Sequence, residues 1–218
     1  ESMRPAIMDF IKNEIAKGRQ IYYVFPLIED SEKLDLNSLM SGYDMVSGYL
    51  SPPEFKYSIV HGKLKPAEKD AAMNQFKNHQ TDILIATTVI EVGVNVPNAS
   101  VMVIENAERF GLAQLHQLRG RVGRGNEQSY CILITKPGLS ENGYKRIATM
   151  VRTNDGFEIA KVDLELRGPG ELDGTKQSGV LELKLADIRH DESTLIASRV
   201  EAQLWLERDE LLQNPDSE

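Results

Sequence analysis

Residues 4–26, RPAIMDFIKNEIAKGRQIYYVFP, contain the unit that decides the fold. Gly18 stops a stretch in which apolar residues recur at helical spacing, namely Ile7, Phe10, Ile11 and Ile15. Gln20–Phe25 is then a β-rich run, which Pro26 ends. The segment therefore predicts a helix followed by a short strand, and a chain that repeats this unit builds an α/β domain.

The same alternation continues downstream. Further buried strands are expected at Tyr57–Val60, Ile83–Ala86, Val101–Ile104 and Tyr130–Ile134. Helices are expected at Leu36–Val46, Pro66–Phe76 and Leu112–Leu118, with a charged loop at residues 29–35. This alternation predicts a parallel sheet sandwiched by helices, with its chemistry in the loops beyond the carboxyl ends of the strands.

After Pro137 the pattern becomes helical. Tyr144–Val151 and Phe157–Leu166 are expected to form a helical hairpin around an Asn-Asp-Gly turn at residues 154–156. A Gly-rich loop (168–179) and a last helix (192–212) follow. The expected division is a first domain at 1–137, the hairpin and Gly-rich loop at 138–186, and a C-terminal helix at 187–218.

The composition fits an ordinary globular protein, with 41% hydrophobic and 27% charged residues. No run approaches the roughly eighteen apolar residues of a membrane span, and no secretory leader opens the chain. The single cysteine, Cys131, excludes an internal disulfide and is expected to pack inertly in a reducing compartment. The net charge of −8 argues against a strong, self-sufficient DNA-binding surface, although a local groove remains open.

The most specific feature is QLHQLRGRVGR at residues 114–124. Arg121 and Arg124 are three residues apart and would share one face of a helix, while Gly120 and Gly123 let a polyanion approach the backbone. A guanidinium group suits phosphate, and an arginine that reaches across a cleft to a transferring phosphoryl group can contribute about 10³–10⁵ in rate. The alternative for isolated arginines is a surface helix with salt bridges.

A second segment, ATTVIEVGVNVP at residues 86–97, directly follows a predicted strand. The hydroxyls of Thr87 and Thr88, with the backbone amides beside them, are well placed to hold a nucleic-acid phosphate or to orient a nucleotide. The alternative is that Thr88 is only the N-cap of a short helix.

Two more loops follow predicted strands. In VHGKLKP, residues 60–66, His61 can donate to a DNA phosphate, and Lys63 or Lys65 adds positive charge. A purely structural histidine is the alternative. In FPLI, residues 25–28, the strand ends at Pro26, which alone is a weak signal.

In this order the four segments resemble the second RecA-like domain of superfamily-two helicases, over Ile21–Thr135. The resemblance implies a RecA-like sheet of the P-loop NTPase type. Implied roles are catalysis for Arg121 and Arg124, ATP binding for Gln117, Gly93 and Asn95, and DNA binding for Pro26, His61, Gly62, Thr87 and Thr88. Asn95 stands where the family usually has aspartate, so this position can donate and accept hydrogen bonds but brings no charge.

The last third narrows the family. TNDGFEIA (153–160), DLELRGPGE (163–171) and QSG (177–179) resemble the translocation motif shared by the RecG family and transcription-repair coupling factors. The Asn-Asp-Gly and Arg-Gly-Pro-Gly-Glu strings are more similar to the RecG family. The resemblance implies that the hairpin relays motor movement to duplex DNA.

Within this motif, Arg152, Arg167 and Gln177 are expected to form the polar network that ties the hairpin to its loop. An ion pair between Arg167 and Glu165 or Glu171 is the alternative. Lys176 stands where arginine is common, which removes the paired donors of a guanidinium, and Asp173 stands where an apolar residue is common.

The chain contains neither a Gly-x-x-x-x-Gly-Lys-Ser/Thr loop nor an Asp-Glu-x-His motif. In the resembling family these Walker A and B motifs belong to the first RecA-like domain. The resemblance therefore implies that ATP and Mg²⁺ bind mainly there, that this chain alone is inactive, and that it has no metal ligands of its own. Implied partners are branched DNA (forks and Holliday junctions) and the first RecA-like and wedge domains of the same protein. No membrane is implied, and the implied place is the bacterial cytoplasm, at the nucleoid.

The function expected is that of a motor fragment of an ATP-dependent DNA helicase that regresses forks and migrates Holliday junctions in recombination and repair. One alternative is the equivalent lobe of a transcription-repair coupling factor. An RNA helicase of the same superfamily is disfavoured because those enzymes lack the hairpin. A non-catalytic RecA-like interaction module is the other alternative, and the presence of Gln117, Arg121 and Arg124 weighs against it.

Overall fold

The structure is a computed structural model of the 218-residue chain. It describes residues 3–26, 32–87, 96–123, 125, 128–167, 197, 198 and 201. The chain divides into two compact units, residues 1–166 and 167–218. The Gly-rich loop expected at 168–179 lies outside the described residues, as does most of the helix expected at 192–212. None of the helices in the described part is long and apolar enough to span a membrane.

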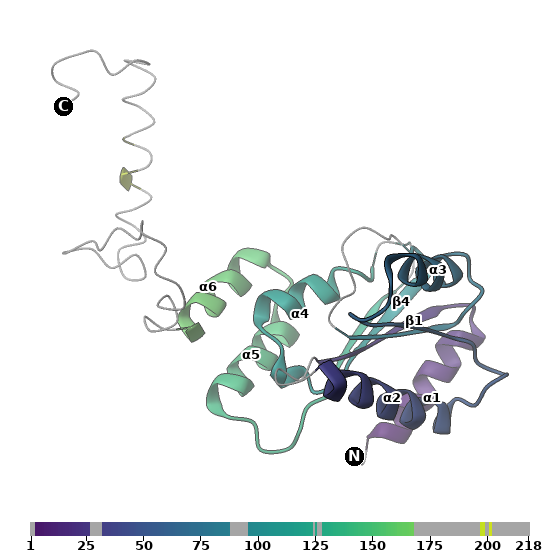
Figure 1. The fold of residues 1–218 in the computed structure, drawn as a ribbon. Helices are drawn as coiled ribbons and strands as arrows, with labels where there is room; N and C mark the ends of the chain where they lie inside the picture. Colours follow the sequence, from purple (N-terminus) through teal and green to yellow (C-terminus); the bar gives the residue numbers. More distant parts are fainter. Residues whose placement is uncertain are drawn as a thin grey trace. The chain divides into compact units, whose positions relative to one another are not determined.

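The first unit is built on a five-stranded sheet in the order β2-β3-β1-β4-β5 (Figure 1). Every neighbouring pair is parallel. The strands are β1 (Gln20–Phe25), β2 (Tyr57–Val60), β3 (Ile83–Thr87), β4 (Ala99–Ile104) and β5 (Tyr130–Leu133). The parallel sheet predicted from the sequence is therefore confirmed, with β1 at its centre.

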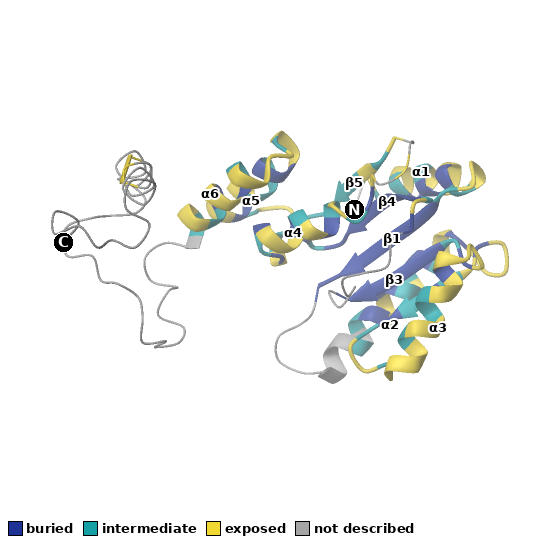
Figure 2. Ribbon diagram, turned by 90° about the horizontal axis from the view of Figure 1, so that it is seen from above, coloured by how far each residue is buried: buried dark blue, intermediate teal, exposed yellow. Residues whose placement is uncertain are grey.

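Helices cover both faces of the sheet, as the continuous burial of the central strands requires (Figure 2). Tyr23 and its same-face neighbours pack against α1 (Arg4–Ala16) and α2 (Glu32–Tyr49). Tyr22 and Val24 face the opposite cluster, which includes residues of α3 (Pro66–Lys77) and α4 (Leu112–Arg119).

One boundary differs from the sequence prediction. Residues 29–35 were expected to be a loop because they are charged, but α2 already begins at Glu32. Glutamate, lysine and leucine are good helix formers, so the charged stretch can continue the helix that the downstream apolar residues stabilise.

The predicted helical hairpin is confirmed as α5 (Glu141–Arg152) and α6 (Gly156–Arg167). The Ser140 hydroxyl caps α5 by accepting from the amide of Gly143 (3.1 Å). In the turn, the amide of Phe157 donates to the Asp155 carboxylate (2.8 Å). The Asn-Asp-Gly signal thus marks the turn, and its Gly156 is already the first residue of α6.

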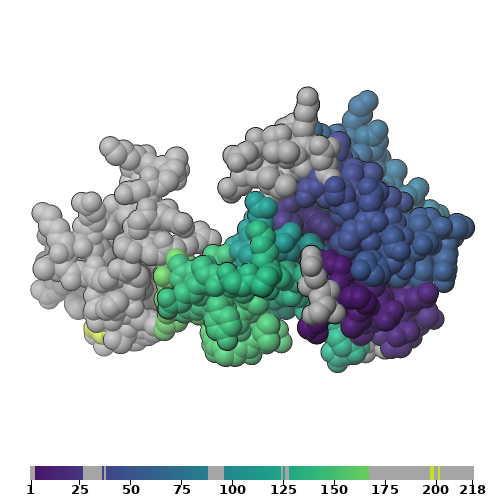
Figure 3. Space-filling model, turned by 90° about the horizontal axis from the view of Figure 1, so that it is seen from below, coloured from purple at the N-terminus to yellow at the C-terminus, as the bar shows by residue number. Residues whose placement is uncertain are grey.

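The hairpin shares its core with the sheet. Met150 of α5 and Ile159 and Val162 of α6 are buried in the same cluster as Leu115 and Leu118 of α4. In the space-filling view the green residues of the hairpin lie directly against the teal residues of the α4 region (Figure 3). Within residues 3–166, hairpin and sheet are therefore one packed body.

A partly buried ion pair holds the carboxyl end of β4. The Arg4 guanidinium donates to both carboxylate oxygens of Glu105, at 3.0 and 2.7 Å. The hydroxyl of Tyr23 donates to the same carboxylate (2.8 Å). Burial, followed by the charge of Glu105, raises the pKa of Tyr23 above its usual range, so that this hydroxyl stays protonated. The network joins α1 to two neighbouring strands.

Replacing Arg4 by methionine is expected to lower the free energy of unfolding by about 3 kcal/mol, because it leaves the Glu105 carboxylate buried without a counter-ion. Urea denaturation of the chain measures the change. The double variant R4M/E105M removes both charges and should recover at least half of the loss. A loss below about 0.5 kcal/mol for R4M alone would show that water screens the pair.

Candidate functional site

The structure brings three of the predicted DNA-binding residues to one edge of the sheet. Strands β2, β3 and β1 are neighbours, and the register pairs Val60 with Ala86 and Phe25 with Thr87. His61 follows β2, Thr87 ends β3 and Pro26 follows β1. These residues therefore meet at the carboxyl edge, as expected of functional loops in parallel sheets.

His61 is prepared to act as a hydrogen-bond donor. Its Nδ1 accepts from the backbone amide of Lys63 (3.3 Å), which leaves the proton of a neutral ring on Nε2. Partial burial, followed by the charges of Lys63 and Lys69, lowers the pKa of His61. Gly62 beside it is exposed, so the backbone at this position is open to a ligand.

Thr87 and Pro26 are placed differently. Both are buried, and the Thr87 hydroxyl has no hydrogen-bond partner in the structure. Because the hydroxyl is buried, a phosphate can reach it only if Thr87 moves. This burial does not favour the DNA contact predicted for Thr87, which stays a prediction. Thr88 lies outside the described residues.

The arginine segment differs from its prediction in one respect. Helix α4 ends at Arg119, and Gly120 is its C-cap. Arg121 therefore lies in a turn, not on a helix, and Gly123 follows with a φ of 83° that favours glycine. On a helix Arg121 and Arg124 would share a face, but α4, which was expected at Leu112–Leu118, ends before Arg121.

The Arg121 side chain is partly exposed, and Gln117, on the last turn of α4, is exposed. Both can therefore meet a ligand or a second domain from outside. Arg124, Gly93 and Asn95 lie outside the described residues, so their roles stay predictions.

The loop that carries Arg121 lies at the amino edge of the sheet. A Cβ on Gly125 would lie 2.7 Å from the carbonyl oxygen of Pro97, so only glycine fits there without a shift. Pro97 shortly precedes β4. Because α4 runs back along the sheet, it carries the arginine loop (residues 120–125) away from the carboxyl edge where His61 lies. Chemistry was expected in the loops beyond the carboxyl ends of the strands, and the structure places the Arg121 loop at the other edge, so there are two candidate surfaces.

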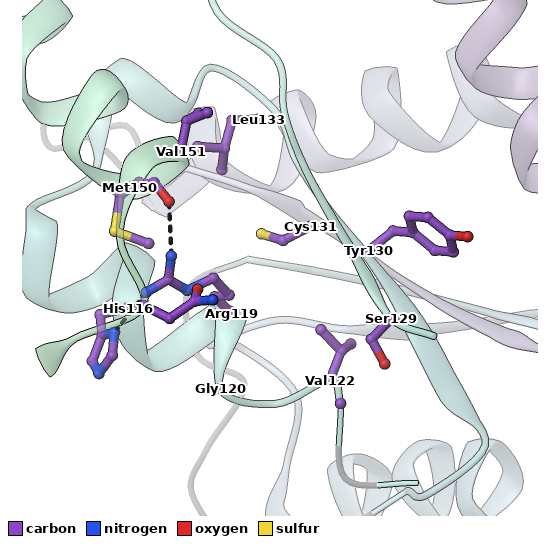
Figure 4. Close-up of a pocket in the computed structure, with 12 residues that line it drawn as sticks. His116, Arg119, Gly120, Val122, Ser129, Tyr130, Cys131, Leu133, Met150 and Val151 are labelled. Carbon is purple, nitrogen blue, oxygen red and sulfur yellow. Dashed lines mark hydrogen bonds between the residues drawn. The ribbon is translucent and has the colours of Figure 1, made fainter. Parts of the chain in front are cut away.

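A pocket of about 540 Å³ lies between α4, β5 and α5 (Figure 4). Arg119, Val122, Cys131 and Met150 are among its lining residues. Burial raises the pKa of Cys131 to about 11, so the thiol stays protonated. This agrees with the prediction of an inert cysteine.

Sequence reasoning missed two arginines that hold the hairpin to the sheet. Arg119 Nη1 donates to the carbonyl oxygens of Met150 (2.7 Å) and Thr153 (2.8 Å). Arg146 of α5 donates to the carbonyl oxygen of Glu108 (2.9 Å). Arg119 lies within the segment of residues 114–124. Its contacts could not be identified from the sequence, because every residue type has a main-chain carbonyl group.

Of the three residues predicted for the translocation network, only Arg152 is described with its side chain. Arg152 is exposed and forms an ion pair with Glu158, so it links the end of α5 to the first turn of α6. Hydrogen bonds from Thr153 and then Arg152 lower the pKa of the Glu158 carboxyl. The side chains of Arg167 and Gln177 lie outside the described residues, so the network stays a prediction.

The side chains present indicate whether the described residues suit a metal ion or a phosphate. Among the described residues, no group of three or more His, Cys, Asp or Glu side chains could hold a metal ion. Arg121 in the arginine loop instead carries a partly exposed guanidinium group, a type of donor that suits a phosphate.

Comparison with known proteins agrees with this geometry. The model of the helicase conserved C-terminal domain matches residues 5–126, more than half of the chain, and the model described as "ATP-dependent DNA helicase RecG, domain 3, C-terminal" matches residues 153–218. A solved structure described as RecG bound to a three-way DNA junction is 43% identical, with a TM-score of 0.66, and the match covers 79% of this chain and 22% of that one.

Curated relatives carry the same description. The ATP-dependent DNA helicases RecG of Synechocystis sp. and Bacillus subtilis are 50% and 48% identical over 214 residues, which is 98% of this chain. The chain spans only 26% and 31% of their lengths. The chain therefore belongs to the helicase conserved C-terminal domain family, with its RecA-like fold, in the form that RecG helicases carry.

Proposed function

We propose that the chain is the second motor domain of an ATP-dependent DNA helicase that remodels branched DNA, by fork regression and Holliday-junction migration in recombination and repair. One observation carries the proposal: the hairpin α5–α6 packs on α4, the helix that leads directly into Arg121. A nucleotide-facing loop and a candidate translocation element are thereby attached to the same helix. The relatives' description as RecG supports the choice of substrate.

In this proposal Gln117, Arg121 and Arg124 face a nucleotide held by the first motor domain of the complete protein. Bound ATP supplies free energy through hydrolysis of its terminal phosphate, and Mg²⁺ is held mainly by that first domain. Arg121 contributes a permanent positive charge, which stabilises negative charge as it develops on the transferred group. The partial exposure of its side chain supports this role.

DNA contacts belong to the opposite edge of the sheet. A neutral His61 donating from Nε2, with the exposed backbone of Gly62 beside it, suits a phosphate of the DNA backbone. Such contacts position a strand without reading its sequence, which suits a motor that acts on any DNA.

The proposed organisation is a motor domain at 1–137, a translocation hairpin and loop at 138–186, and a C-terminal helix at 187–218. The proposed partners are branched DNA and the first motor and wedge domains of the same protein, in the cytoplasm of a bacterium. The match of residues 153–218 to the RecG model supports this reading over a transcription-repair coupling factor.

The isolated chain is expected to hydrolyse ATP no faster than a buffer blank, with or without forked DNA, because it supplies only one wall of the active site. Phosphate release measured at saturating ATP checks this. Adding the purified first motor and wedge domains should raise turnover above the blank. Steady DNA-stimulated turnover by the chain alone would mean that a complete ATP site lies within it.

In the complete helicase, Arg121→Ala is expected to lower kcat for ATP hydrolysis about 10³-fold while changing the Kd for ATP less than about threefold, because the arginine acts on the transition state. Stopped-flow binding of a fluorescent ATP analogue and steady-state hydrolysis separate the two quantities. Arg109→Ala, at an exposed arginine that precedes the other end of α4, is the control. An equal loss in Kd and kcat would make Arg121 a ground-state ligand.

A further inference from the structure

Arg119, the last residue of α4, holds the end of α5. Its Nη1 lies 2.7 Å from the carbonyl oxygen of Met150 and 2.8 Å from that of Thr153. Its Nη2 lies 3.2 Å from Nδ1 of His116, one turn earlier on the same helix. Figure 4 shows the guanidinium between the two helices, with its bond to Met150 drawn.

The two carbonyls are chemically suited to this cation. Met150 belongs to the last turn of α5 and Thr153 is its C-cap, so their oxygens lie where a helix leaves carbonyl groups without intrahelical partners. The negative end of the helix dipole lies at the same place, which favours a positive charge. Arg119 of α4 thus caps α5, although the two contacting segments are some thirty residues apart in the chain.

His116 contacts the other side of the hairpin turn. A Cβ added to Gly156, the first residue of α6, would lie 3.4 Å from Nε2 of His116. The imidazole therefore packs against the turn, while the neighbouring guanidinium binds the end of α5. We call the set Arg119, His116, Met150, Thr153 and Gly156 the α4–hairpin joint.

We propose that Arg119 is a positioning residue that couples the arginine loop to the hairpin. Only Gly120 separates Arg119 from Arg121, so a shift of the loop at the nucleotide moves the guanidinium that grips α5. The bonds end on main-chain oxygens, so they follow the position of the helix and not the identity of its side chains. This inference rests on the proposed function, because it assumes that Arg121 faces a nucleotide.

The alternative is that Arg119 only stabilises the fold. A purely structural cap would change hydrolysis and DNA remodelling by the same factor, through the amount of folded protein. A coupling residue changes their ratio. The ratio of base pairs unwound to ATP hydrolysed is therefore the quantity that separates the two roles.

The test uses the complete helicase with Arg119→Met, which keeps much of the side chain's length and removes all of its donors. DNA-stimulated ATP hydrolysis is expected to stay within about threefold of the unsubstituted enzyme, while base pairs of fork unwound per ATP fall at least about tenfold. Arg119→Lys retains the charge and should restore part of the ratio. Arg109→Met, at an exposed arginine ten residues earlier, should leave the ratio unchanged.

A second variant changes the α4–hairpin joint at a residue of the hairpin. Gly156→Leu places a bulky side chain against His116, whose Nδ1 lies 3.2 Å from Arg119 Nη2, and it should lower the same ratio. If R119M and G156L leave the ratio unchanged, or if hydrolysis and unwinding fall together by one factor, the coupling role is overturned.

Hydrogen exchange distinguishes failure of this inference from failure of the proposed function. In the complete protein, ATP-analogue binding should change amide exchange in residues 150–156, and R119M should abolish that response. If the unsubstituted protein unwinds no fork, the proposed function fails, and the exchange response alone then decides whether the joint transmits nucleotide binding. An exchange response that survives in R119M overturns the inference.

Discussion

The constraint on which the rest of the structure depends is the burial of the parallel sheet on both faces. A strand such as β1 exposes neither face to water, so each face needs its own layer of helices. On one face the layer is extended by the hairpin, whose Met150, Ile159 and Val162 join the cluster formed with α4. The hairpin thereby becomes part of the core on that face of the sheet. Movement of one cannot be absorbed by a loose contact, because close-packed interiors transmit displacement.

This packing explains how two candidate surfaces at opposite edges can work together. His61 lies beyond the carboxyl end of β2, while the arginine loop packs against Pro97 near the amino end of β4. In the proposed function, the nucleotide and the DNA therefore lie at separate edges of the sheet and do not compete for space. Helix α4 contacts the hairpin and leads directly into the arginine loop. The proposed motor function and the role proposed for Arg119 both rest on that helix.

Much of the fold could be predicted because its signals are local. The bounds of α1 and of β1 follow from apolar spacing, Gly18 and Pro26, and the Asn-Asp-Gly turn places the hairpin. The site was harder to predict, for physical reasons. Whether Arg121 lies on a helix depends on where Gly120 ends α4, and whether Thr87 faces solvent depends on packing above β3. The contacts of Arg119 were not predictable, because their acceptors are carbonyl groups some thirty residues away that every residue type possesses.

The use of main-chain acceptors at Met150 and Thr153 has an evolutionary consequence. Side chains on the outer face of α5 can be exchanged freely without removing either acceptor, so this helix surface is open to drift or to new partners. The number of residues in α5 is constrained more strictly. One residue inserted or deleted within α5 would rotate its terminal carbonyls by about 100° relative to the sheet. Related helicases should therefore tolerate substitutions along this segment far better than changes in its residue count.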